Sequence, residues 1–163
     1  MLLPTQYRSN RDHGFAYGAI CGAKLSGLLV STYHLMFKSH LYHWSLVGPM
    51  FGSLHILAQS HHAELAAGAE AIRQRLAALG HGVPPAPELD ADFSGRMPKV
   101  QIAPMLEIVE DLGADHAGAM RQIEAIEMLA DEAEDLQTLE LMMGRHAFHT
   151  EALTMLAATL RHQ

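Results

Sequence analysis

Four long segments of this sequence carry apolar stripes with helical spacing, and this periodicity restricts the possible folds more than any other feature. In the first segment, from about Gly14 to Ser45, apolar residues recur at intervals of three and four. The other three segments run from about Phe51 to Leu79, Pro104 to Leu129 and Glu134 to Leu160. No stretch sustains the alternation of apolar and polar residues that is typical of a strand. The sequence therefore predicts an all-α fold of four helices.

The connections between these segments differ in length. Gly48-Pro49 separates the first two, and the acidic run Asp131–Asp135 separates the last two. The connector between the second and third, residues 80–104, holds five of the seven prolines and has room for one short helix at Glu88–Phe93. It begins with Gly80, which is a suitable C-terminal cap for the second helix. Two short joins and one long second-to-third crossover are the connectivity of a ferritin-like four-helix bundle.

The length and the cysteine content fit a single-domain protein of the cytoplasm. We expect 163 residues to form one domain, with an N-terminal tail at residues 1–13 and the bundle at residues 14–163. The first residues lack the basic and then apolar layout of a signal peptide, and no run of about eighteen apolar residues could span a membrane. The one cysteine, Cys21, excludes an internal disulfide, and we expect it to be a small buried residue.

The chain has twelve histidines, which raises the question of a metal site. His43 and Trp44 end the first predicted helix, and His55 lies in the first turns of the second. Glu70 and Gln74 are four residues apart further along the second helix, so they share one face. Imidazole and carboxylate groups are common ligands of iron and zinc, so these residues are candidate ligands.

The pattern HW-x-x-x-G-P-x-F-x-x-x-H, from His43 to His55, resembles that of Dps, the DNA-binding protein from starved cells, a mini-ferritin family. The motif R-x-x-x-L-G at Arg75–Gly80, the motif D-x-x-T at Asp135 and Thr138, and the segment HTEALTML from His149 follow the same layout. The resemblance implies a hollow dodecamer that oxidises Fe(II), often with hydrogen peroxide, and stores ferric mineral. It also implies a homo-oligomer whose iron centre lies between two-fold-related subunits.

Within that centre, the resemblance implies two histidines from one subunit and carboxylates from both. His43, His55 and Glu70 match the family pattern, whereas Gln59 and Gln74 stand where the family has an aspartate and a glutamate. Glutamine offers a neutral oxygen and cannot bridge two irons as a carboxylate does. The remaining donors suit one divalent ion, either Fe(II) or Zn(II) as a competitor, with the second position weak or rebuilt.

His62 is the nearest histidine that could rebuild the second position, because it lies seven residues after His55 on the same helical face. Of the adjacent pair His61 and His62, we expect at least one to be only solvated. Trp44 either packs at an interface or, as the resemblance implies, takes up oxidising equivalents close to iron. His40 lies three residues before His43, and we expect it to have an outer-shell or surface role rather than to bind the metal. We expect His116, His146 and His149 to pack or to form hydrogen bonds.

A centre inside each bundle, as in bacterioferritin, is a rival to the shared centre. Such a centre needs carboxylates on several helices and two E-x-x-H pairs. The first predicted helix has no acidic residue, and no E-x-x-H occurs in the chain. We therefore do not expect an iron centre of this kind.

The charges of the chain are unevenly distributed. Residues 1–80 carry six lysines and arginines against three acids, and residues 81–163 carry five against fifteen. In the Dps family, acidic residues near the start of the last helix line three-fold pores that draw in cations. The corresponding candidates here are Asp131, Glu132, Glu134 and Asp135.

Direct DNA binding at neutral pH is not expected. The N-terminal segment has Arg8 and Arg11 but no lysine, whereas the Dps feature that often binds DNA is a flexible lysine-rich tail. A formal charge of −7 per chain gives −84 for twelve chains, and DNA binding requires positive charge to displace counterions from phosphates. Protonated histidines could raise binding at lower pH.

Two functions remain open on the sequence alone. The first is an iron-oxidising and iron-storing cage that protects against oxidative stress, with an altered metal centre. The second is a cage without ferroxidase activity that acts as a metal-binding or structural stress protein. We favour the first, because two histidines and one acid, His43, His55 and Glu70, remain at the family positions.

Overall fold

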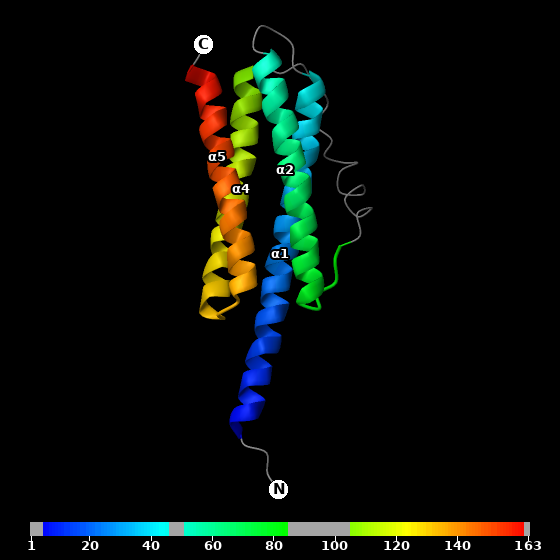
Figure 1. Ribbon diagram of the computed structural model, residues 1–163, viewed down its shortest axis with the longest axis vertical. Helices are drawn as coiled ribbons and strands as arrows, with labels where there is room; N and C mark the ends of the chain where they lie inside the picture. The colour runs from blue at the N-terminus through cyan, green and yellow to red at the C-terminus, as the bar shows by residue number, and fades with distance from the viewer. Residues whose placement is uncertain (1–4, 46–50, 85–104, 162–163) are drawn as a thin grey trace.

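The computed structural model describes residues 5–45, 51–84 and 105–161. These residues form a four-helix bundle without any strand, so the prediction of an all-α ferritin-like bundle is confirmed. Figure 1 shows the helices side by side, with the two termini at opposite ends of the molecule. No helix in these ranges has an apolar stretch long enough to cross a membrane. The helices are α1 (Thr5–Ser45), α2 (Phe51–Ala78), α4 (Met105–Glu132) and α5 (Leu136–Arg161).

The bounds of α2, α4 and α5 agree with the sequence pattern to within three residues. Helix α1 differs, because it begins at Thr5 rather than near Gly14. No proline or glycine interrupts residues 5–13, and Figure 1 shows these first turns projecting beyond the ends of the other helices. The expected tail is thus helical from Thr5, and its separation from the bundle stays a prediction. The Gly48-Pro49 join and the expected helix at Glu88–Phe93 lie outside the described residues.

The apolar stripes of the four helices meet in the core of the bundle. Fully buried side chains from all four helices form one cluster, which includes Cys21 as expected. A second cluster contains Leu35, Leu65, Leu112 and Leu156. Burying an aliphatic side chain of this size contributes about 1.5–3 kcal/mol, so these stripes are the main source of stability. The first cluster includes Leu25, Leu28, Leu29, Ile72, Leu76, Ile123, Ile126 and Met142.

Helix α2 ends in a glycine cap. Gly80 has a φ of +69°, a conformation that glycine adopts without strain. The amide of His81 donates to the carbonyl of Leu76 at 3.0 Å, and the amide of Gly80 donates to the carbonyl of Ala77 at 3.0 Å. These two bonds make a Schellman motif and satisfy carbonyls that the end of the helix would otherwise leave open. The C-terminal cap predicted from the sequence is therefore confirmed.

The turn from α4 to α5 repeats this arrangement with a different residue. Glu134 occupies the left-handed position with a φ of +57°, and the amide of Asp135 donates to the carbonyl of Ala130 at 2.9 Å. Asp135 then caps α5, because its Oδ1 accepts a hydrogen bond from the amide of Thr138 at 3.1 Å. The acidic run thus ends one helix and starts the next.

A partly buried ionic cluster joins α1 to α4. The Lys38 ammonium lies 3.0 Å from Asp111 Oδ1 and 2.5 Å from Asp115 Oδ2. The Tyr42 hydroxyl donates to Asp111 Oδ2 at 2.6 Å. Lys38 is only 8% exposed, so these carboxylates compensate a charge that would otherwise be costly to bury. The cluster aligns α1 and α4 close to position 43.

Candidate metal centre

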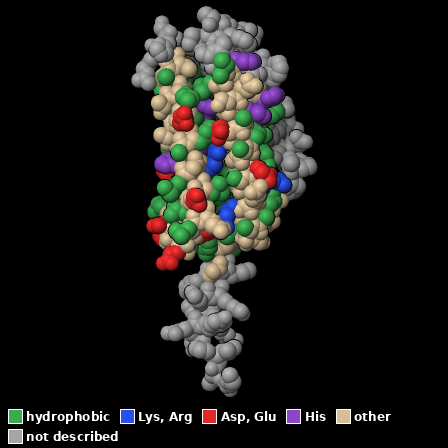
Figure 2. Space-filling model, in the orientation of Figure 1, with side chains coloured by type: hydrophobic (Ala, Val, Ile, Leu, Met, Phe, Trp, Pro, Cys, Tyr) green, Lys and Arg blue, Asp and Glu red, His purple; other side chains and the backbone are tan. Residues whose placement is uncertain are grey.

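The candidate ligands lie on α1 and α2, and the histidines among them lie near the end where these two helices are joined. His43 and Trp44 belong to the last turns of α1, but their side chains lie outside the part of the chain that the structure describes. His55 lies in the second turn of α2 and is half-buried. In Figure 2, the histidine side chains visible on this face of the molecule gather in its upper half, toward this join.

A pocket of about 210 Å³ opens between α1 and α2 next to these positions. Its lining residues are His40 from α1 and Ala58, Gln59 and His62 from α2. The rings of His40 and His62 lie 5.2 Å apart between centroids, and their planes are tilted by 42°. The structure thus brings His62 together with Gln59 and with His40, which is exposed and for which we expected an outer-shell or surface role.

The pair Glu70 and Gln74 lies further along α2 and is exposed. The Gln74 amide donates to Glu70 Oε1 at 3.0 Å, so the two side chains share one face as their spacing predicts. Arg73 Nε lies 3.7 Å from the other carboxylate oxygen of Glu70. This carboxylate therefore has two neighbours with which a metal ion must compete.

One chain cannot bring His55 and Glu70 to the same ion. The two residues are fifteen positions apart on one continuous helix, which separates them by about 22 Å at 1.5 Å per residue. Within the described ranges, no three His, Cys, Asp or Glu side chains converge as metal ligands would. A centre that uses both residues therefore requires a second copy of the chain.

A different group of histidines lies inside the bundle. His61, His116 and His149 come from α2, α4 and α5, and their exposed fractions are 4%, 0% and 1%. The Nδ1 atoms of His116 and His149 are 2.8 Å apart, so one ring donates a hydrogen bond to the other. The ring of His61 packs edge-on against His116 with the centroids 5.2 Å apart. The expectation that His61 or His62 is only solvated is wrong, because His61 is buried and His62 is half-buried.

Burial is the main influence on these histidines, because a protonated ring loses its hydration in the core. It lowers the pKa of His116 and of His149 to about 3, with a further contribution from neighbouring positive charge. It also lowers the pKa of His61. The rings are therefore neutral at pH 7. His116 and His149 pack and hydrogen-bond as expected, whereas His146 is half-buried with Nε2 3.9 Å from Glu124 Oε1.

Arg145 reaches into the same region from α5. Its guanidinium lies 4.5 Å from the centroid of the Phe148 ring, and its Nη1 donates to the carbonyl of Glu64 at 3.3 Å. This path is open because residue 68 is glycine: a Cβ there would lie 2.5 Å from the Arg145 Cζ. Sequence reasoning missed this cluster, although His116 and His149 follow the apolar stripes at intervals of three and four residues.

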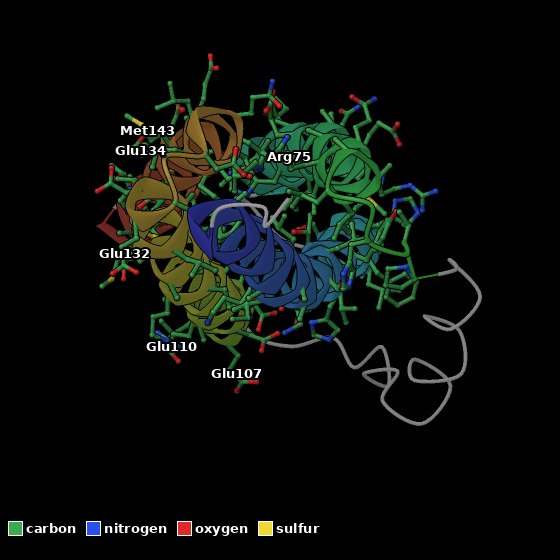
Figure 3. All side chains as sticks on the ribbon, turned by 90° about the horizontal axis from the view of Figure 1, so that it is seen from below. Arg75, Glu107, Glu110, Glu132, Glu134 and Met143 are labelled. Atoms are coloured by element: carbon green, nitrogen blue, oxygen red, sulfur yellow. The ribbon has the colours of Figure 1, made fainter. Side chains whose placement is uncertain are left out.

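The acidic residues between α4 and α5 divide into two groups. Asp131, Glu132 and Glu134 are exposed, whereas Asp135 turns inward and binds Arg75, Tyr17 and Thr138. Figure 3 shows Arg75 between α2 and α5, with Glu132 and Glu134 on the outer side of the turn. Of the four pore candidates, Asp135 is thus engaged within its own chain.

Comparison with known proteins agrees with the fold. The family model for ferritin, described as a ferritin-like domain, matches residues 22–162. An uncharacterized low temperature-induced protein from Nostoc sp. is 30% identical in an alignment of 146 positions that covers 83% of this chain and 76% of that protein.

Two solved structures of Dps proteins have a fold similar to that of this bundle. The Dps protein of Vibrio cholerae, described as a member of a broad superfamily of ferritin-like diiron-carboxylate proteins, has a TM-score of 0.76 at 20% identity, with 90% of this chain and 92% of that chain covered. The high iron form of Dps from Microbacterium arborescens has a TM-score of 0.77 at 20% identity, with 89% and 95% covered. The chain therefore belongs to the ferritin-like family, and its fold is that of the Dps mini-ferritins.

Proposed function

We propose that this protein is an iron-storing mini-ferritin that oxidises Fe(II) at a centre shared by two subunits. The observation that carries the proposal is the separation of His55 and Glu70 along α2, which two antiparallel copies would overcome. His43 and His55 of one subunit and Glu70 of the partner subunit would hold the ion. Two imidazoles and one carboxylate are a suitable donor set for Fe(II), with Zn(II) as a competitor.

The chemistry of this centre follows from its charge. The carboxylate of Glu70 stabilises Fe(III) more than Fe(II), because the ferric ion carries one more positive charge, and this favours loss of an electron. Reduction of one hydrogen peroxide to two waters breaks the O–O bond and consumes two protons and two electrons. Two Fe(II) ions supply those electrons and become Fe(III). With Gln59 and Gln74 in place of acids, the second ion is held weakly and limits the rate.

The neutral side-chain amides of Gln59 and Gln74 also support a second candidate function. Gln74 donates a hydrogen bond to Glu70 and so occupies one oxygen of the only acid in the donor set. A cage with such a centre could bind metal ions without oxidising them, and act as a metal-binding or structural stress protein. The first candidate remains the better supported, because Glu70 is exposed and two histidines, His43 and His55, accompany it at the family positions.

A hollow dodecamer is the proposed assembly. Several large apolar side chains are exposed on the single chain, including Ile56 at 68%, Met128 at 68%, Leu136 at 73% and Met143 at 60%, and neighbouring copies would cover them. They lie on α2, α4 and α5, so more than one face of the bundle would be covered by neighbouring copies. In that assembly, the exposed acids Asp131, Glu132 and Glu134 would attract Fe(II) toward the pores.

Oxidation of Fe(II) under air tests the first function against the second. We expect the wild type to oxidise Fe(II) faster than a protein-free control, and His55→Ala to lose that acceleration. His146→Ala is the matched control, because it removes a half-buried histidine on a different helix and should leave the rate unchanged. Equal rates with and without wild-type protein would overturn ferroxidase activity and favour the second function.

A further inference from the structure

A groove between α1 and α4 brings together two basic side chains, one from each helix. It has a volume of about 510 Å³, within the range of about 300–1,000 Å³ that is typical of small-molecule sites. Its lining residues are Lys24 and Gly27 from α1 and Gly118, Arg121, Gln122 and Ala125 from α4. None of these residues belongs to the candidate metal centre. The lining contains two positive charges and no carboxylate, so the groove suits a negatively charged ligand.

Lys24 and Arg121 are not used elsewhere in the described part of the chain. Neither side chain forms an ion pair or a hydrogen bond with another described residue, and both are exposed. Every other basic side chain that the structure describes has such a partner, namely Lys38, Arg73, Arg75 and Arg145. The two unpaired cations of the described bundle therefore meet at one groove.

Nearby acids do not compensate these charges. The sequence has no acidic residue between Asp12 and Glu64, so the turns of α1 around Lys24 offer no carboxylate. On α4, Glu124 lies one turn beyond Arg121, but its Oε1 is 3.9 Å from the His146 Nε2 of α5. The groove is thus locally positive on a chain whose formal net charge is −7.

Two glycines leave the groove open. A Cβ on Gly118 would lie 3.7 Å from Arg121 Nη2, so the guanidinium lies over this glycine, which itself lines the groove. A Cβ on Gly27 would have no atom within 4 Å, so the space beside α1 is unfilled. Gln122 Nε2 donates to Ser31 Oγ at 2.9 Å, and this hydrogen bond joins α4 to α1 at the groove. The guanidinium N–H groups therefore border a space that a ligand can enter.

We propose that the groove between α1 and α4 binds a phosphate-type oxyanion through Arg121 and Lys24. A guanidinium can donate two parallel N–H groups to two phosphate oxygens, and an ammonium adds a point charge. The ligand is inorganic phosphate or the phosphate group of a small molecule, for whose remainder the groove has room. Solvent and salt screen the exposed cations, so binding is weak and falls as ionic strength rises. The site requires neither iron nor a second subunit.

Titration of the full-length protein with inorganic phosphate, measured by calorimetry at low ionic strength, tests the proposal. A chelator removes metal ions that could bind phosphate themselves. Lys24→Gln and Arg121→Gln should each weaken phosphate binding about fivefold or more, because each removes one charged contact. Arg73→Gln, the matched control, removes one positive charge on α2 outside the groove and should bind phosphate as the wild type does. A parallel titration with glycerol 3-phosphate distinguishes a phosphate monoester from free phosphate as the preferred ligand.

A variant that fills the groove separates this site from general surface charge. Gly27→Leu keeps both cations and places a large side chain in the open space beside α1, so phosphate binding should be lost. Leucine is a better helix former than glycine, and thermal unfolding checks that the variant is folded.

Three results would overturn the proposal. The first is absence of phosphate binding to the wild type, and the second is wild-type affinity in Lys24→Gln, Arg121→Gln or Gly27→Leu. The third is an equal loss of affinity in Arg73→Gln, which would assign the binding to net charge. Phosphate binding in a wild type that fails to oxidise Fe(II) would contradict ferroxidase activity alone and support the groove site.

Discussion

Arg75 of α2 and Asp135 at the start of α5, sixty residues apart in the sequence, form a hydrogen-bonded ion pair with 2.6 Å between Nη2 and Oδ2. Tyr17 from α1 donates to the same oxygen at 2.7 Å, and Thr138 does so at 2.6 Å. Arg75 also donates through Nε to the Thr138 hydroxyl at 2.7 Å. Three helices are thus tied together at one end of the bundle, so the motifs R-x-x-x-L-G and D-x-x-T stabilise the fold.

Replacement of Asp135 should therefore destabilise the protein strongly. Asp135→Ala removes the N-cap of α5 and leaves a largely buried arginine without its counter-charge, which together cost about 3 kcal/mol. For a chain of this size the thermal midpoint should fall by about 6–12 °C. Asp131→Ala removes a nearby exposed acid and should change the midpoint little. Equal midpoints for the two variants would contradict the structural role of Asp135.

Acidification should destabilise the protein through the buried histidines. The pKa of His116 and of His149 is about 3 in the folded state, against about 6.5 in the unfolded chain. Between these values only the unfolded state takes up the proton, so stability falls as the pH falls from 6.5 toward 3. Each histidine contributes a slope of up to about 1.4 kcal/mol per pH unit. Thermal midpoints measured from pH 7 to pH 4 check this.

A double variant identifies the histidines as the cause. His116→Leu with His149→Leu removes both hydrogen-bonding partners together and should reduce the pH dependence above pH 4, with buried His61 contributing to what remains. Asp135 does not contribute to the pH dependence of stability above pH 4. Burial alone would raise its pKa, but hydrogen bonds from Thr138, Tyr17 and Arg75 hold the pKa well below its usual range of about 4. An unchanged slope in the double variant would show that other groups control acid sensitivity.

Restoring acids at the glutamine positions should strengthen the iron centre. Gln74→Glu replaces the amide that binds Glu70 with a second carboxylate, and Gln59→Asp adds another oxygen anion. Two carboxylates repel one another unless a cation lies between them, so both changes favour a second bound iron. The rate of Fe(II) oxidation should rise about tenfold or more, as supporting ligands commonly affect metal sites by this amount. Ala147→Glu adds an exposed negative charge on α5 and should leave the rate unchanged.

Bare plasmid DNA should not be retained by the protein in a gel-shift assay at pH 7.5 with a chelator present. A formal charge of −7 per chain repels phosphate, and no lysine lies in the first fourteen residues. Retention should increase only below about pH 6.5, where exposed histidines gain charge. A shift at pH 7.5 that disappears with added salt would contradict this expectation.

Much of the fold could be predicted because its signals are local. The stripes and Gly80 indicate the bounds of α2, α4 and α5, whereas the cap formed by Asp135 and Thr138 is not predicted and starts α5 two residues later than expected. The start of α1 could not be predicted in this way. The residues before Gly14 project beyond the bundle, so no core face imposes an apolar stripe on them.

The candidate site could be predicted only in part, because long-range contacts decide it. Spacing alone indicates that Glu70 and Gln74 share a face, and their hydrogen bond agrees. The burial of His61 depends on His116 and His149, which come from helices more than fifty residues away. The contact between the rings of His40 and His62 likewise joins two different helices, α1 and α2. The arrangement of His43, His55 and Glu70 around one ion stays a prediction.

Complementation between two inactive chains tests the shared centre most directly. His55→Ala and Glu70→Ala assemblies should each lose tight Fe(II) binding in an anaerobic titration. When both chains are co-expressed, each mixed two-fold pair regains one intact site, because His55 of one subunit and Glu70 of the partner subunit are both present there. Random mixing should restore about a quarter of the wild-type sites. Failure of the mixed assembly to regain any site, with both variants folded, would contradict a centre shared between two copies.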